Sequence, residues 1–116
     1  MNKLTVYNQT QNTQIANQVR IADNPWTRMK GLLGQKSLCV GEALIIRPCQ
    51  SVHMLFMTFA IDVVFLNSQN QVIGLCPRLP PLGFSPVFWK STCAIELPAG
   101  TIEKTKTCAG NVFLIN

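Results

Sequence analysis

The sequence predicts a mainly β domain, a jelly-roll-like β-sandwich or partly closed barrel with one short α-helix near residues 25–33. Short apolar segments rich in β-branched residues recur along the chain and alternate with polar turns, which is typical of strands. One segment alone has helical spacing. The length of 116 residues, with 47% hydrophobic and 13% charged residues, fits one domain with its own core, so we expect a single domain over 1–116.

Strand signals begin near the N-terminus. Apolar residues alternate with polar ones at Leu4, Val6, Ile15, Val19 and Ile21. The run 43–46 is continuously apolar and is ended by Pro48, which predicts a buried strand.

The helix signal lies between these strands. Asn24 can cap a helix, Pro25 suits its first position, and Gly34 supplies a stop. The apolar residues at helical spacing are Trp26, Met29, Leu32 and Leu33. We therefore expect a short helix near 25–33.

Further strands are expected in the C-terminal half. The segment 61–66 is β-branched and aromatic, 67–70 is polar, and 72–75 is apolar again, which predicts a β-hairpin. Segments 93–97 and 112–115 complete the set.

A proline-rich segment covers residues 77–91. Its four prolines exclude a central strand or a helix interior. Because it also contains Leu, Phe and Trp, we expect an ordered loop that packs down as a lid.

The charge pattern argues against nucleic-acid binding. The formal net charge is +5, but the closest basic pairs are Arg28 with Lys30 and Lys104 with Lys106, and no basic run follows. No signal peptide is visible, and the apolar stretch 54–66 is too short and interrupted to span a bilayer. We expect a cytoplasmic monomer or weak dimer with no membrane partner.

Five cysteines lie at positions 39, 49, 76, 93 and 108, without a CxxC pair. A zinc site usually has two closely spaced ligand pairs, and His53 is the one histidine available. We therefore expect reduced, buried thiols in a reducing compartment, no metal and no cofactor.

A set of motifs in fixed order resembles a known family. The motifs are Arg28-Met29-Lys30-Gly31-Leu32-Leu33-Gly34, Pro48-Cys49-Gln50-Ser51-Val52-His53, Met57, 61–66, Glu96-Leu97-Pro98-Ala99-Gly100 and Gly110-Asn111. Together they resemble the domain-of-unknown-function family 192, an uncharacterised prokaryotic group. The resemblance implies a compact jelly-roll-like β domain and no established activity. Ala60 stands where the family usually has proline, and Asn111 where it usually has aspartate.

Asp62 is the most informative single residue. It lies inside an apolar strand on the same face as Val64 and Leu66, where an unpaired carboxylate costs several kcal/mol of desolvation. Either backbone N–H groups or a basic side chain satisfy it, or its face is wet and functional. The candidate basic partners are Arg28, Arg47 and Arg78.

Two other ionisable residues could carry chemistry. Glu96 lies in an apolar strand like Asp62, and two carboxylates facing one cleft could form a general acid/base pair. Otherwise Glu96 is a strand-end acid satisfied by a turn. His53 has Ser51 and Cys49 nearby, a loose nucleophile–base arrangement, and is otherwise bonded into a loop.

Apolar residues around these positions have two interpretations as well. Those at 54–59 could line a pocket or form a core strand. Phe88 and Trp89 could form a lid or a stacking platform.

The amino-acid sequence is compatible with three functions. The first is a binding module for a small polar ligand, sugar or peptide. Its candidate ligand-binding residues are His53, Asp62, Glu96, Arg28, Arg47 and Arg78. The second is a protein-interaction domain that uses the 77–91 loop. The third is a small hydrolase-like enzyme with Asp62 and Glu96, and His53 as a further catalytic candidate. We rank the binding module first.

Overall fold

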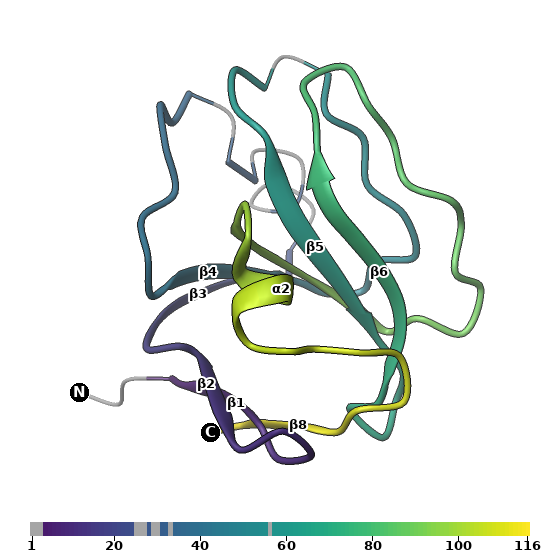
Figure 1. Ribbon diagram of the computed structural model, residues 1–116. Coiled ribbons are helices and arrows are strands. Elements are labelled where there is room, and N and C mark those ends of the chain that lie inside the picture. Colours follow the sequence, from purple (N-terminus) through teal and green to yellow (C-terminus); the bar gives the residue numbers. More distant parts are fainter. Residues whose placement is uncertain (1–3, 25–27, 29–30, 33, 56) are drawn as a thin grey trace.

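The computed structural model describes residues 4–24, 28, 31–32, 34–55 and 57–116, and its strands form two sheets (Figure 1). The smaller sheet has the order β2-β1-β8 and the larger β3-β4-β7-β5-β6. The elements are β1 (Val6–Asn8), β2 (Thr13–Ala16), β3 (Gln18–Ala22), β4 (Glu42–Ile46), β5 (Ile61–Leu66), β6 (Val72–Leu79), β7 (Cys93–Pro98), α2 (Thr101–Lys104) and β8 (Phe113–Ile115). The predicted mainly β fold is confirmed.

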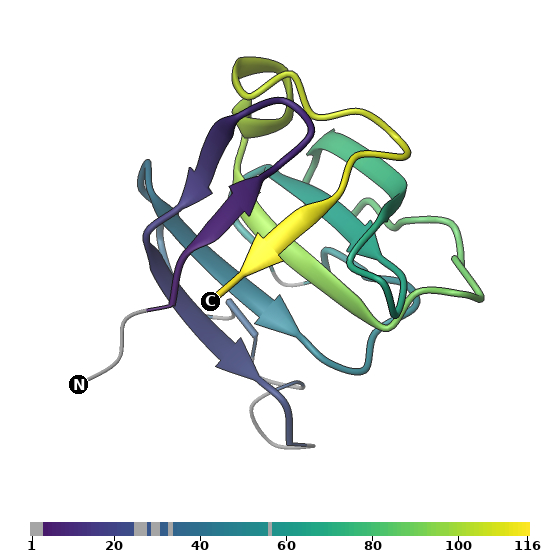
Figure 2. The same cartoon turned by 90° about the horizontal axis from the view of Figure 1, so that it is seen from below.

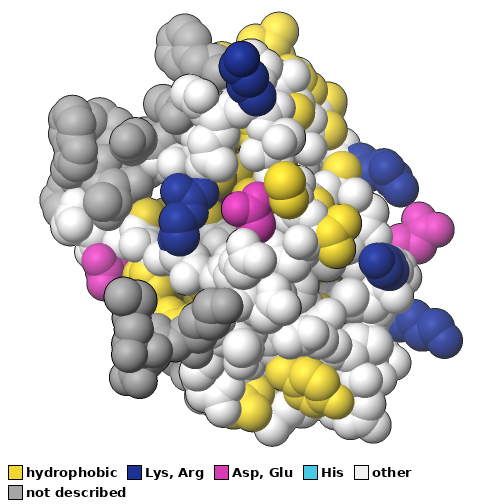
Figure 3. Space-filling model, turned by 90° about the vertical axis from the view of Figure 1, so that its left-hand side faces the viewer, with side chains coloured by type: hydrophobic (Ala, Val, Ile, Leu, Met, Phe, Trp, Pro, Cys, Tyr) yellow, Lys and Arg dark blue, Asp and Glu magenta, His cyan; other side chains and the backbone are white. Residues whose placement is uncertain are grey.

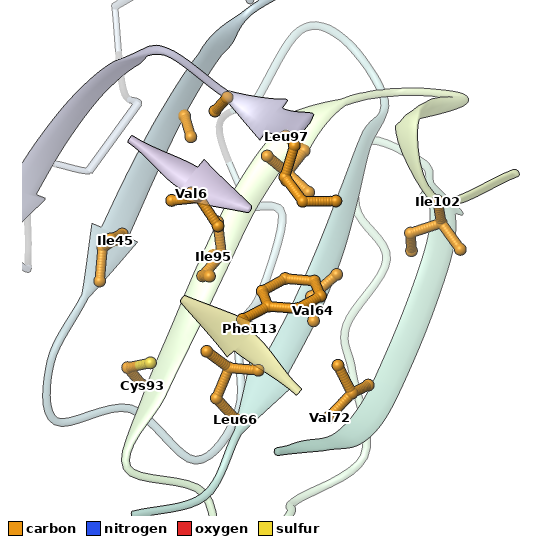
Figure 4. Close-up of a cluster of buried hydrophobic side chains, with 13 residues drawn as sticks. Val6, Ile45, Val64, Leu66, Val72, Cys93, Ile95, Leu97, Ile102 and Phe113 are labelled. Atoms are coloured by element: carbon orange, nitrogen blue, oxygen red, sulfur yellow. The ribbon is translucent and has the colours of Figure 1, made fainter. Parts of the chain in front are cut away.

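The main core lies between the sheets. The three-stranded sheet lies across one face of the five-stranded sheet (Figure 2). Val6 from β1 and Phe113 from β8 point toward Ile45, Ile95 and Val64 of the larger sheet (Figure 4). All five are almost completely buried, so this interface is the principal source of hydrophobic stabilisation.

Strand register determines which side chains project from each face of the larger sheet. Glu96 of β7 lies opposite Leu44 of β4 and Val63 of β5, so these three share the outer face, away from the small sheet. Asp62 lies opposite Leu97 and shares the inner face. Loops rather than a sheet cover the outer face.

The alternating segment near the N-terminus divides between the two sheets. Asn17 separates β2 from β3, and the backbone N–H groups of Asn17 and Gln18 both donate to the carbonyl of Gly41 at 2.9 Å. β3 then pairs parallel with β4, an arrangement that the alternation alone did not predict.

β6 extends beyond the predicted strand into the proline-rich segment. It reaches Leu79 and includes Pro77, so the expectation of a loop from residue 77 is wrong at its start. β6 is an edge strand, where a residue without an N–H group is tolerated. Pro77 and Arg78 together face Asp62 as a β-bulge.

Residues 50–54 and 82–88 lie side by side as an irregular antiparallel ribbon. The Met54 N–H donates to Gly83 at 2.8 Å, and the Phe88 N–H donates to Gln50 at 2.8 Å. Residues 54, 55 and 57–59 are therefore loop and not the predicted core strand, although Met54 itself is fully buried.

The remainder of the proline-rich segment packs down only in part. The Phe88 ring contacts that of Phe65, with 4.7 Å between ring centroids. Phe84 and Trp89 are each 77% exposed and Leu82 is 74% exposed, so the segment is not a closed lid.

The expected helix near 25–33 falls mostly outside the described residues, but Gly31 and Leu32 form a turn with Gly31 at a φ of 49°, so the expectation is wrong at its C-terminal end. The short helix α2 was not predicted. Within the described ranges, no helix is long and apolar enough to cross a membrane.

Candidate functional site

A hollow of about 200 Å³ lies on the outer face of the larger sheet. Its lining consists of Arg28, Gly31, Leu32, Ile46, Pro48, Cys49, Ser51, Val52, His53, Leu55, Met57 and Glu96. The floor comes from β4 and β7, and the walls come from the loop that follows β4 and from the segment around Arg28. Of the six predicted ligand-binding residues, the hollow brings together Arg28, His53 and Glu96.

Glu96 is the buried acid of this hollow, which we call the Glu96 cavity. It is 7% exposed and lies on the middle strand of the larger sheet. Within the part of the chain that the structure describes, no group donates a hydrogen bond to its carboxyl, and no side-chain oxygen there is both fully buried and without a partner, so the Glu96 carboxyl is open to the cavity. The remaining exposure of Glu96 is toward the cavity that it lines.

Burial raises the pKa of Glu96 from 4.5 to about 7, because a carboxylate loses hydration there without an opposing charge to replace it. Glu96 therefore changes protonation state near neutral pH. Strongly shifted acids in cavities are over-represented at functional sites.

Cys49 lines the cavity together with Glu96 and Arg28. Burial raises the pKa of its thiol, the Glu96 charge raises it further, and the Arg28 charge lowers it. The thiol donates to the Ser51 carbonyl at 3.1 Å. A thiol held protonated is a poor nucleophile, so these contacts do not favour the Cys49–His53 arrangement considered from sequence.

His53 and Ser51 are exposed residues at the cavity wall. His53 forms an isolated β-bridge with Phe84, so the backbone of the 50–54 segment fixes its position. The bridge concerns the backbone of His53, and no hydrogen bond of its imidazole is found among the described residues.

Asp62 has a structural role away from the cavity. Its carboxylate is completely buried and accepts the N–H of Arg78 at 2.8 Å and the N–H of Ile102 at 2.7 Å. Ile102 lies in the first turn of α2, whose N-cap is Gly100. Asp62 therefore caps the helix in place of a side chain that glycine lacks, and it also satisfies the bulge in β6. Backbone groups, rather than an arginine, compensate its charge.

The two-carboxylate enzyme is contradicted by this register. Asp62 and Glu96 leave opposite faces of the larger sheet and cannot flank one substrate. Arg47 and Arg78 are exposed and do not line the cavity, and the Arg78 guanidinium lies near Gly100 instead.

Sequence reasoning identified part of the cavity wall. Leu55 and Met57, considered as pocket residues, do line it, whereas Phe56 lies outside the described residues. Ile46, Pro48 and Val52 were not predicted as lining residues. Their position depends on how loops fold over the sheet, for which the sequence carries no periodic signal.

Outside the Glu96 cavity, we considered the basic side chains, a second hollow and possible metal ligands. On the face shown in Figure 3, Lys and Arg side chains stand apart rather than gathering into one patch. A second hollow of about 460 Å³ lies between the β2–β3 junction and α2, and among the described residues Lys104 is the one charged residue in its lining. No three His, Cys, Asp or Glu side chains among the described residues are placed to hold a metal ion.

Fold and cavity together define a small two-sheet β domain with a buried acid beneath loops. The model of the uncharacterised ACR family DUF192 matches residues 6–115, so the chain belongs to that family. It is 36% identical over 109 residues to the UPF0127 protein PF1050 of Pyrococcus furiosus, covering 90% of this chain and 91% of that one. It is 32% identical over 104 residues to UPF0127 protein PH1112 of Pyrococcus horikoshii, covering 87% and 90%.

A solved structure supports the fold. A protein of unknown function from Novosphingobium aromaticivorans superimposes with a TM-score of 0.82 at 16% identity, covering 97% of this chain and 83% of that chain. At this identity the likeness concerns the fold alone.

Proposed function

We propose that this protein is a binding module for a small polar ligand, and that the Glu96 cavity is its site. The carrying observation is that Glu96, 7% exposed, lines a cavity and accepts no hydrogen bond from any residue that the structure describes. Buried polar groups normally have a hydrogen-bond partner. A ligand that donates a hydrogen bond would supply that partner.

The size and lining of the cavity support a small ligand. Sites for drug-sized molecules have volumes of roughly 300–1,000 Å³. The Glu96 cavity, at about 200 Å³, is smaller, which favours a compact molecule over an oligosaccharide or a nucleotide. Most of its wall is apolar and its polar groups are few, the usual composition of a ligand site.

The test is a thermal-shift screen of the full chain at pH 8. The panel contains small amino acids, monosaccharides, short carboxylates and short amines. A ligand present at 100 times its Kd stabilises the folded state by about 2.7 kcal/mol. We expect at least one compound class to raise Tm, and we expect Glu96→Gln to abolish that rise.

The matched control is Glu103→Gln, which makes the same chemical change at an exposed position on α2. It should retain the full rise in Tm. The proposal fails if no compound shifts Tm, or if Glu96→Gln responds as the unmodified chain does.

A further inference from the structure

The charges that line the Glu96 cavity restrict the class of ligand. Glu96 is buried in the floor and Arg28 is an exposed residue of the same lining. Cys49 lies within electrostatic reach of both, because each charge shifts its pKa in the opposite direction. The two charges therefore act on one small space.

The two charges do not neutralise each other. No ion pair or hydrogen bond joins Glu96 to Arg28 among the described residues, although both line the cavity. Each of the two groups therefore has capacity for a group of the ligand.

Resting on the proposed function, we infer that the cavity binds a small zwitterion of the amino-acid class, with its ammonium group on Glu96 and its carboxylate toward Arg28. A carboxylate accepts N⁺–H donors in charge-assisted hydrogen bonds, and a guanidinium binds carboxylates in the same way. A ligand with both groups satisfies the buried acid and leaves no added net charge in the cavity.

The apolar wall favours an aliphatic side chain on this zwitterion. Leu32, Ile46, Val52, Leu55 and Met57 all line the cavity. The cavity is small, so amino acids with short side chains fit this lining better than aromatic ones.

The test is isothermal titration calorimetry of the full chain at pH 8 with L-valine and with two analogues, each of which lacks one charged group of L-valine. Isobutylamine lacks the carboxylate and isovalerate lacks the ammonium group. Glycine, L-alanine, L-leucine and L-methionine are included so that side-chain size does not decide the outcome. We expect the amino acid with the highest affinity to bind at least 10-fold more tightly than isobutylamine or isovalerate.

Substitutions at Glu96 and Arg28 test which of these residues binds which charged group of the ligand. Glu96→Gln should weaken the amino acid and isobutylamine at least 10-fold and leave isovalerate unchanged. Arg28→Gln should weaken the amino acid and isovalerate and leave isobutylamine unchanged. Glu103→Gln and Arg47→Gln, at exposed positions outside the cavity lining, are the matched controls and should change none of these affinities.

Proton release provides a second readout. Below pH 7 an arriving ammonium group displaces the proton from Glu96, so titrations at pH 6 in buffers of different ionisation heat should show close to one proton released. Cys49, His53 and Arg28 also line the cavity, and the signal belongs to Glu96 only if Glu96→Gln removes it.

The outcomes separate the two proposals. If isovalerate or a monosaccharide binds at least as tightly as all of the amino acids, the inference of a zwitterionic ligand is wrong, while the proposal of a binding module stands. If the amino acids bind but Glu96→Gln and Arg28→Gln leave their affinity unchanged, the assigned groups are wrong. If nothing in either panel binds, the proposed function itself is overturned.

Discussion

The Asp62 carboxylate joins β5 to the first turn of α2 by accepting the backbone N–H of Ile102 at 2.7 Å. Its second oxygen accepts the N–H of Arg78 at 2.8 Å. One buried acid thus satisfies two backbone donors that have no strand partner, and it fixes the helix against the sheet.

Asp62→Asn should therefore destabilise the fold. We expect the free energy of unfolding to fall by about 2–5 kcal/mol, because one buried N–H loses its acceptor and the other hydrogen bond loses its charge. Urea denaturation measures the change. Asp23→Asn, at an exposed position, should stay within about 0.5 kcal/mol of the unmodified chain. A loss below 1 kcal/mol at position 62 would contradict the assigned role.

Glu96 should make stability depend on pH. Its pKa is about 7 in the folded chain against an ordinary value of 4.5, so above pH 4.5 the acid ionises first in the unfolded chain. Stability from this group is complete below pH 4.5, falls as pH rises, and levels off above about pH 7. At about 1.4 kcal/mol per pKa unit, the total loss is about 3 kcal/mol.

Glu96→Gln should remove that slope and make the chain more stable than the unmodified one at pH 8. The measurement is the free energy of unfolding between pH 4 and pH 8 for both chains without ligand. Subtracting the two curves cancels the contributions that the two chains share. Parallel curves would show that Glu96 is not desolvated as described.

The Phe88 ring closes over Gly74 of β6. A Cβ at position 74 would lie 2.6 Å from two ring atoms, too close for any real contact. Gly74→Ala should therefore cost about 1–3 kcal/mol. In a Phe88→Ala background the same change should cost at least 1 kcal/mol less, a coupling that a double-mutant cycle detects. Additive losses would mean that the two residues do not meet.

The neighbouring aromatic residues offer a contrast. Phe84 and Trp89 are mostly exposed. Phe84→Ser and Trp89→Ser should each change the free energy of unfolding by less than about 1 kcal/mol. A larger loss would show that this segment packs more closely than its exposure indicates.

The thiols should divide into two reactivity classes. Cys39 and Cys108 are exposed, which corrects the expectation that all five are buried. Burial raises the pKa of Cys49 and Cys76, and that of Cys93 to about 11. Labelling of the native chain with a thiol reagent at pH 8 should modify Cys39 and Cys108 first, and urea should expose the rest. Early modification of Cys93 would contradict its buried position.

Strands with continuous apolar character could be predicted from the sequence. The segment 61–66 matches β5 at both ends, and 43–46 and 93–97 match β4 and β7 to within one residue. Such runs are fully buried and end at turns, so local pattern and tertiary burial agree. The pairing of 50–54 with 82–88 could not be predicted because it is irregular and neither segment shows alternation.

Site prediction failed where register mattered. Asp62 and Glu96 look alike in sequence, each an acid in an apolar strand. Their faces depend on the pairing of β5 with β7, which puts Val63 opposite Glu96 and Asp62 opposite Leu97. A one-residue difference in register changes which face a side chain occupies, and no local feature of either strand fixes that register.

The acid of the cavity and the walls of the cavity have different structural origins. Glu96 is held by a strand that is hydrogen-bonded on both sides, whereas much of the wall comes from described residues of the connection between β4 and β5. Wall residues of this connection can therefore be exchanged without moving the strand that carries the carboxyl. Under the proposed function, swapping the connection would change ligand selectivity without rebuilding the sheet.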